Sequence, residues 1–177
     1  MDYASYLEWT NDFPKPGIKF CDIWSLLAKV DLRKVLSDKL KERWQSALDG
    51  SEPIFLGGIE ARGFAVAGML TQAPWCVMVP IRKVGKLPPK DIVQQGINLE
   101  YGADILEMQK AKAPGANMIL VDDVLATGGT LDGAKILAEK AGYTVIGAVV
   151  LVNLLAVKKT SDWPASDNVV SLIDIGD

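Results

Sequence analysis

The chain has 177 residues, with 19 Lys and Arg against 22 Asp and Glu, and it contains no histidine. The missing imidazole excludes a Ser-His-Asp or Cys-His catalytic set and a histidine-ligated metal, so any acid–base chemistry must use other groups. The formal net charge of −3 argues against a dedicated nucleic-acid binder, which would carry a basic surplus.

Apolar periodicity predicts helices that alternate with buried strands. The segment 31–48 repeats a large apolar residue at every fourth position, which predicts an amphipathic helix capped by Asp31. Continuous apolar strands between helices are typical of the α/β class, with a parallel central sheet covered by helices on both faces. We expect a single domain over 1–177. In chain order, the further predicted elements are a strand at 53–58, a helix at 62–72, strands at 75–81 and 118–121, a helix at 131–141, a strand at 144–154 and an edge strand at 169–173.

The segment 82–117 interrupts this alternation and shows no obvious core element. A connection of that length in a compact domain is usually functional, so we expect a flexible lid with a small antiparallel hairpin. It opens with a basic run, Arg82 to Lys90, which has four cations and no acid within nine residues. Such runs are commonly solvated loops, but this one directly follows a strand end, where parallel sheets bind ligands. That position favours an anion site.

The strongest chemical signal lies at 118–131, where a buried strand runs into Asp122 and Asp123 and then into a Gly- and Thr-rich loop, 126–130. Backbone N–H groups, threonine hydroxyls and a helix N-terminus together suit a phosphate. The paired carboxylates suit vicinal hydroxyls, or a Mg²⁺ that bridges hydroxyls and phosphate. The combination predicts a sugar-phosphate site, against the alternative of a capped surface turn.

A second strand-turn-helix segment, 57–64, places Arg62 at a helix start. The helix dipole does not favour a cation there, so an anionic ligand beside Arg62 is the functional interpretation, and an ordinary exposed arginine is the alternative. The chain contains neither the P-loop pattern nor the G-x-G-x-x-G dinucleotide fingerprint. A P-loop nucleotidase and a dinucleotide enzyme are therefore excluded.

These segments together resemble a known family. The run from Asp122 to Thr130 is similar to the phosphoribosyl pyrophosphate (PRPP) signature of type I phosphoribosyltransferases. Segments 13–18, 60–64, 82–88 and 99–110 resemble the adenine branch of that family in order and spacing. The resemblance implies the type I fold, with a base-binding hood at 1–30 and a lid region at 82–117. It also implies purine salvage by a Mg²⁺-dependent homodimer, in which adenine and PRPP give AMP and pyrophosphate.

The resemblance further implies roles for individual residues. Ribose hydroxyls would be held by Asp122 and Asp123, with the metal bound only indirectly through them and the substrate. The 5′-phosphate would be cradled by Ala126, Thr127, Gly128, Gly129 and Thr130. Pyrophosphate would face Glu60, Ala61, Arg62, Arg82, Lys83 and Lys86, with a cis peptide between Glu60 and Ala61, and with Arg82 reaching the neighbouring subunit's site. The base would contact Ile18, Lys19, Phe20 and Cys21. The catalytic set would be Glu100 and Tyr101 on the lid, together with Arg62.

The sequence departs from the family's usual pattern around the base at Lys19, Cys21 and Asn153, and Lys158 and Lys159 replace a Gly-Arg pair that is common in the family. Recognition through the backbone of 18–21 would survive these changes, so adenine is the expected acceptor and hypoxanthine or guanine the alternative. We expect Lys19 to point to solvent and Cys21 to be a packed thiol, not a reactive one. A non-catalytic PRPP or nucleotide sensor on the same fold is a further alternative, but a sensor has no need of Glu100 and Tyr101.

The remaining expectations concern compartment and partners. No apolar run approaches the roughly 20 residues of a membrane span, so no membrane partner is expected. Cys21 and Cys76 lie far apart and fit neither a disulfide framework nor a zinc site. With no recognisable signal peptide at the start, these features favour the cytoplasm.

Overall fold

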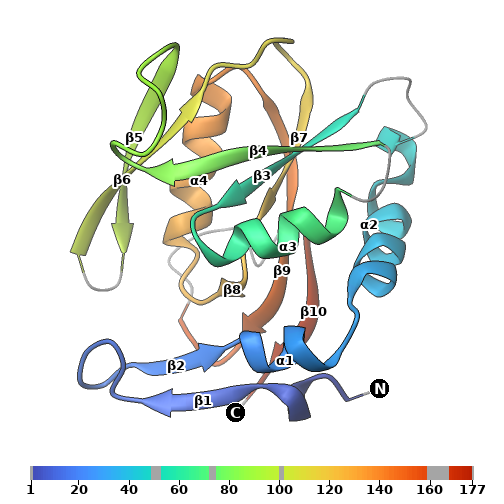
Figure 1. Ribbon diagram of the computed structural model, residues 1–177, viewed down its shortest axis with the longest axis vertical. Helices are drawn as coiled ribbons and strands as arrows, with labels where there is room; N and C mark the ends of the chain where they lie inside the picture. The colour runs from blue at the N-terminus through green and yellow to red at the C-terminus, as the bar shows by residue number, and fades with distance from the viewer. Residues whose placement is uncertain (1, 49–52, 72–74, 100–101, 159–167, 177) are drawn as a thin grey trace.

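A computed structural model of the protein describes residues 2–48, 53–71, 75–99, 102–158 and 168–176 (Figure 1). Within these ranges the central sheet has eight strands: β3 (Ile54–Ile59), β4 (Cys76–Lys83), β5 (Ile92–Leu99), β6 (Gly102–Gln109), β7 (Asn117–Val121), β8 (Val124–Leu125), β9 (Thr144–Leu154) and β10 (Val169–Ile175). Their spatial order is β10–β9–β7–β3–β4–β6–β5, with β8 beside β9. Strands from β10 to β4 pair in parallel, whereas β6 pairs antiparallel with both β4 and β5. The predicted parallel core is confirmed, and β10 is an edge strand as expected.

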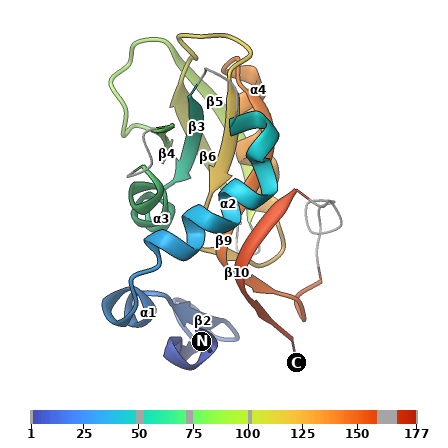
Figure 2. The same ribbon diagram turned by 90° about the vertical axis from the view of Figure 1, so that its right-hand side faces the viewer.

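Helices cover both faces of this sheet, as predicted (Figures 1 and 2). α2 (Arg33–Leu48) and α3 (Arg62–Leu70) cover one face, and α4 (Gly129–Lys140) covers the other. Alternate residues of β7 point to opposite faces of the sheet. Ile119 packs in the cluster that contains Val66 of α3, and Leu120 packs in the cluster that contains Leu137 of α4. A strand buried on both faces has no polar alternation, which explains its continuous apolar sequence. No described helix is long and apolar enough to cross a membrane.

The helix predicted at 31–48 begins at Arg33 and is kinked. Asp31 Oδ1 accepts a hydrogen bond from the Arg33 backbone N–H at 3.1 Å, which is the predicted cap. At Trp44 the backbone leaves the helical region (φ −120°, ψ 27°), and the indole Nε1 donates to the carbonyl oxygen of Ile146 at 3.3 Å. The predicted apolar stripe is buried: Leu32, Leu36, Leu40 and Trp44.

The expectation that 82–117 lacks a core element is wrong. β4 extends to Lys83, and β5 and β6 form an antiparallel hairpin that widens the sheet. Ile97, Leu106 and Met108 are buried in the same cluster as α4. The fit against α4 is close, because a Cβ on Gly133 would lie 1.9 Å from Cγ2 of Ile97. Charged and amide residues alternate with these apolar ones, so the sequence lacks the continuous run that marks the other strands. The small hairpin itself was predicted and is present.

The N-terminal part forms a separate layer at the C-terminal ends of the parallel strands (Figure 1). It consists of a 3₁₀ turn, η1 (Ala4–Tyr6), the strands β1 (Glu8–Asn11) and β2 (Lys19–Asp22), and the short helix α1 (Trp24–Lys29). β1 and β2 form a two-stranded antiparallel sheet, with Trp9 opposite Cys21. The hairpin therefore covers the edge of the sheet where ligands of parallel α/β folds bind.

Candidate active site

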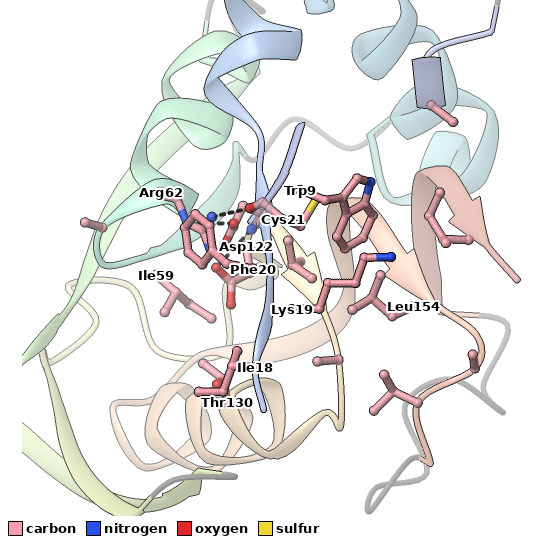
Figure 3. A pocket seen from close by; sticks show the side chains of 18 of the residues that line it. Trp9, Ile18, Lys19, Phe20, Cys21, Ile59, Arg62, Asp122, Thr130 and Leu154 are labelled. Atoms are coloured by element: carbon pink, nitrogen blue, oxygen red, sulfur yellow. Dashed lines mark hydrogen bonds and ion pairs between the residues drawn. The ribbon is translucent and has the colours of Figure 1, made fainter. Parts of the chain in front are cut away.

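A cavity of about 990 Å³ lies between the β1–β2 hairpin and the C-terminal ends of β3, β7, β9 and β10 (Figure 3). Ligands of open α/β sheets bind at this edge, so its position agrees with the fold. It brings together residues that the sequence predicted from three separate segments: Ile18, Lys19, Phe20 and Cys21 from the hairpin, Glu60, Ala61 and Arg62 from the turn after β3, and Asp122, Asp123, Ala126 and Thr130 from the loop after β7.

Other predicted residues do not line the cavity. Arg82 and Lys83 end β4 and donate hydrogen bonds to Glu60, and Lys86 lies in the turn after β4, with its carbonyl hydrogen-bonded to Arg82. Thr127, Gly128 and Gly129 complete the loop whose ends, Ala126 and Thr130, are in the wall. Glu100 and Tyr101 lie outside the described residues.

Several lining residues were not predicted. Leu154 ends β9 and Ile175 ends β10, so their place at the C-terminal edge of the sheet was a usable signal. Trp9 lines the cavity because it pairs opposite Cys21 in the β1–β2 hairpin. No pattern in the sequence predicted this register of the two strands. The unpredicted part of the lining is Ala4, Trp9, Gly17, Ile59, Val124, Leu154, Ala156, Val157, Ile175 and Gly176.

Arg62 connects the hairpin to the acidic pair (Figure 3). Its Nε lies 2.8 Å from Asp123 Oδ2, its Nη1 donates to the Cys21 carbonyl oxygen at 2.9 Å, and its guanidinium lies 4.6 Å from the centroid of the Phe20 ring. A close backbone approach holds it there, because a Cβ on Gly63 would lie 2.5 Å from the Val121 carbonyl oxygen. The start of α3 thereby meets the end of β7.

The two carboxylates after β7 are crowded and largely screened from water. Asp123 is 6% exposed, and its backbone N–H donates to Asp122 Oδ1 at 2.9 Å. Burial, followed by the charge of Asp123, raises the pKa of Asp122 well above its usual range. Added hydroxyl donors or a cation would relieve this excess of negative charge. The described residues contain no group of three or more Asp, Glu, Cys or His that could hold a metal alone.

The loop 126–130 leads directly into α4 at the rim of the cavity. The N-cap is Gly128, which has no side chain to offer the first helical N–H groups, and the helix begins at Gly129. Thr130, in the first turn, lines the cavity. A glycine-rich entry into a helix, with hydroxyls beside it, is the arrangement that binds phosphate in many α/β proteins.

Within the described residues, carboxylates pair with two of the three predicted cations at the end of β4 and in the turn after it: Arg82 and Lys83, but not Lys86. The Glu60–Ala61 peptide is cis, as the resemblance implied. Glu60 accepts hydrogen bonds from Arg82 Nε at 3.1 Å and from the Lys83 backbone N–H at 3.0 Å, and the Arg82 bond lowers the pKa of Glu60. Lys83 Nζ lies 2.8 Å from Asp104 Oδ2. Across the described ranges, the Lys86 ammonium forms no ion pair with a carboxylate.

The hairpin side is aromatic and apolar. The Phe20 ring meets Phe13 edge-on, with centroids 5.0 Å apart. Lys19 is exposed, as expected, but it also lines the cavity, where its Nζ lies 4.8 Å from the centroid of the Trp9 ring. Cys21 is 4% exposed, and burial raises the pKa of its thiol to about 11, so it is the packed, unreactive thiol that was predicted. Asn153 is not part of the lining, and its Nδ2 donates to Asp174 Oδ1 at 3.2 Å.

Comparison with known proteins gives consistent matches. The family model of the phosphoribosyl transferase domain matches residues 26–175. The chain is 43% identical to an adenine phosphoribosyltransferase of Rhodospirillum centenum over 155 residues, which cover 87% of this chain and 88% of that protein. The adenine phosphoribosyltransferase structure from Rhodothermus marinus superposes with a TM-score of 0.82 at 34% identity, covering 98% of this chain and 96% of that one. The Saccharomyces cerevisiae enzyme, solved with adenine and an imino-altritol bisphosphate, gives 0.79 at 29% identity, with coverage of 97% and 96%.

Proposed function

The chain belongs to the phosphoribosyltransferase family, and from this premise we propose that it transfers the phosphoribosyl group of PRPP to adenine, giving AMP and pyrophosphate in purine salvage. One observation carries the proposal: a single cavity joins an acidic pair, a phosphate-type loop, Arg62 and the aromatic ring of Phe20. Such a cavity offers groups for ribose hydroxyls, a phosphate, a second anion and a flat base.

The reaction needs no histidine. The adenine nitrogen forms a bond to the anomeric carbon as the bond from that carbon to pyrophosphate breaks, and adenine loses a proton. Positive charge develops on the ribose, so we assign Asp122 and Asp123 to its hydroxyls, and the loop 126–130 to the 5′-phosphate. Negative charge develops on the leaving group, where Arg62, Lys83 and Lys86 are the cations we assign.

The residues present fit a Mg²⁺ that arrives with the substrate. Asp122 and Asp123 lie side by side in the wall of the cavity, and carboxylate oxygens are the ligands that Mg²⁺ prefers. Two carboxylates with substrate oxygens are the usual protein share of such a site. When bound, the metal supplies positive charge to the leaving pyrophosphate. Chelation should therefore abolish nucleotide formation, and added Mg²⁺ should restore it.

The lid, the subunit arrangement and the compartment belong to the same proposal. We assign Glu100 to the proton that adenine loses, with Tyr101 beside it, and a lid at 82–117 to exclude water. We also propose a homodimer in which Arg82 reaches the neighbouring site, which requires its pair with Glu60 and its bond to the Lys86 carbonyl to open. The cytoplasm is supported by Cys21 and Cys76, which are both free thiols.

Competition between purines tests the function most directly. Adenine presents an amino donor at its six-position, whereas hypoxanthine presents a carbonyl acceptor there. Recognition by backbone carbonyls of 18–21 would leave the carbonyl of hypoxanthine facing another acceptor, at roughly 1–3 kcal/mol per unpaired group. With PRPP, Mg²⁺ and equal adenine and hypoxanthine, AMP should form faster than IMP. Faster IMP formation would make the adenine assignment wrong, and no purine-dependent release of pyrophosphate would favour a sensor.

A further inference from the structure

Glu107 is a buried carboxylate outside the cavity to which the proposed reaction gives no task. It lies on β6, opposite Arg82 of β4 and opposite Gln94 of β5. Its neighbours Leu106 and Met108 are buried in the cluster with α4, so Glu107 lies on the other face of the strand. It is nevertheless only 3% exposed. A charged side chain is rarely buried to this degree unless it is paired.

The partners of Glu107 are backbone N–H groups of the turn after β4. Its Oε1 accepts hydrogen bonds from the N–H groups of Lys86 and Leu87, both at 2.8 Å, and its Oε2 accepts one from Gln94 Nε2 at 3.2 Å. On the other side of the same residue, the Lys86 carbonyl oxygen accepts a hydrogen bond from Arg82 Nη1 at 3.1 Å. The backbone of Lys86 is therefore held at both its donor and its acceptor.

The neighbouring acid on β6 is used differently. Asp104 binds the Lys83 ammonium directly, with 2.8 Å between Oδ2 and Nζ. Burial alone would raise the pKa of Glu107, but the N–H groups of residues 85–87 hold that pKa below its usual range. Glu107 thus keeps its charge while bonding to backbone, and the Lys86 ammonium has no ion pair with any carboxylate in the described part of the chain. An unpaired ammonium on a fixed backbone suits an external anion.

We propose that Glu107 is a positioning residue, which fixes the turn 84–87 so that the Lys86 ammonium meets the pyrophosphate of PRPP. This inference rests on the proposed function, since it takes pyrophosphate as the anion. It differs from a general stabilising role, because the binding of PRPP should depend on Glu107 and the binding of adenine should not.

Steady-state kinetics of three variants test this. In Glu107→Ala the KM for PRPP should rise by roughly tenfold or more, the scale of a lost charge-assisted hydrogen bond, while the KM for adenine stays within about twofold. Glu107→Gln should restore most of the loss, because an amide oxygen still accepts from both N–H groups and Gln94 can turn its own amide to match. Met108→Ala is the control, because it removes core packing from the same strand without touching the turn.

Two further measurements separate the possible failures. Hydrogen exchange in the peptide 84–90 should be faster in Glu107→Ala and unchanged in Glu107→Gln. The double variant with Lys86→Ala should have the KM for PRPP of Lys86→Ala alone, because Glu107 acts through Lys86. Equal rises in both KM values, the same split in Met108→Ala, unchanged exchange or additive effects would each overturn the inference. If the wild-type protein forms no nucleotide from PRPP, the proposed function fails, and with it pyrophosphate as the anion.

Discussion

Asp122, directly after β7, and Glu107, on β6, are both largely shielded from water, but their pKa values are shifted in opposite directions. At Asp122, burial and then the charge of Asp123 raise the pKa. At Glu107, burial acts in the same direction but backbone N–H donors outweigh it, and the pKa is lowered. What replaces the lost water decides the outcome: a like charge at Asp122, and two backbone N–H groups with the amide of Gln94 at Glu107.

The difference separates a site that can gain a ligand from one that is already complete. Arg62 forms its ion pair with Asp123, whereas Asp122 stays beside a like charge in the wall of an open cavity, so hydroxyl donors or a cation would be bound favourably there. Glu107 has its donors from its own chain and gains nothing from a ligand. A perturbed carboxylate therefore indicates binding when its environment leaves it unsatisfied, and indicates positioning when its environment satisfies it.

The largest expected effect comes from neutralising the acidic pair. Asp122→Asn and Asp123→Asn should each lower kcat/KM by about 10²–10³-fold, the scale of a preorganised charged contact in a closed site. The Tm of Asp122→Asn should be equal to or above that of wild type, because a like-charge repulsion is removed. Initial rates and thermal melts measure the two quantities, with Glu139→Gln, an exposed acid at the end of α4, as the control. Near-normal turnover in both variants would remove the pair from the mechanism.

A smaller loss is expected at Arg62, which joins the pair to the hairpin. Arg62→Lys keeps the charge, but an ammonium cannot contact Asp123, the Cys21 carbonyl and the Phe20 ring together. We expect kcat/KM to fall by roughly 10- to 100-fold, with both KM values raised, since two charge-assisted contacts are lost. Arg33→Lys, the same change at an exposed arginine of α2 that pairs with Asp31, is the matched control. Wild-type kinetics in Arg62→Lys would show that charge alone matters there.

The smallest effects lie in the dependence of stability on pH, and they should have opposite signs. The pKa of Asp122 is above its unfolded value of about 3.9, so wild type loses stability as pH rises past that value. The Tm of Asp122→Asn relative to wild type should therefore increase from pH 4 to pH 7.

The pKa of Glu107 is below its unfolded value of about 4.3. The contribution of its charge to folding stability is therefore present above that value and is lost as pH falls through the folded pKa. The Tm deficit of Glu107→Gln should shrink on acidification. Parallel melts of both variants at several pH values test this, and trends of the same sign would contradict it.

Sequence patterns predicted the parts of the molecule that can be recognised from residues adjacent in the chain. Continuous apolar strands marked the parallel core, and Asp122 with Asp123 stood out because acids directly followed such a strand. The β5–β6 hairpin was predicted as part of a lid and not as part of the core sheet, because Glu107 interrupts its apolar residues. The burial of Glu107 depends on a turn that folds over it. Trp9 was missed because its place in the cavity depends on the register of two short strands, which no local pattern determines. The kink at Trp44 depends on a contact with β9 that is distant in sequence.

Relatives of this chain should vary at positions 97 and 133 together. Cγ2 of Ile97 occupies the space that a side chain at Gly133 would need, with 1.9 Å between them. An alanine at 133 is therefore compatible only with a residue at 97 that lacks this methyl branch on Cβ, since a packed core does not absorb an extra methyl without strain. Hybrid enzymes built by exchanging the hairpin 92–109 between relatives should fold well only when residue 133 is exchanged with it.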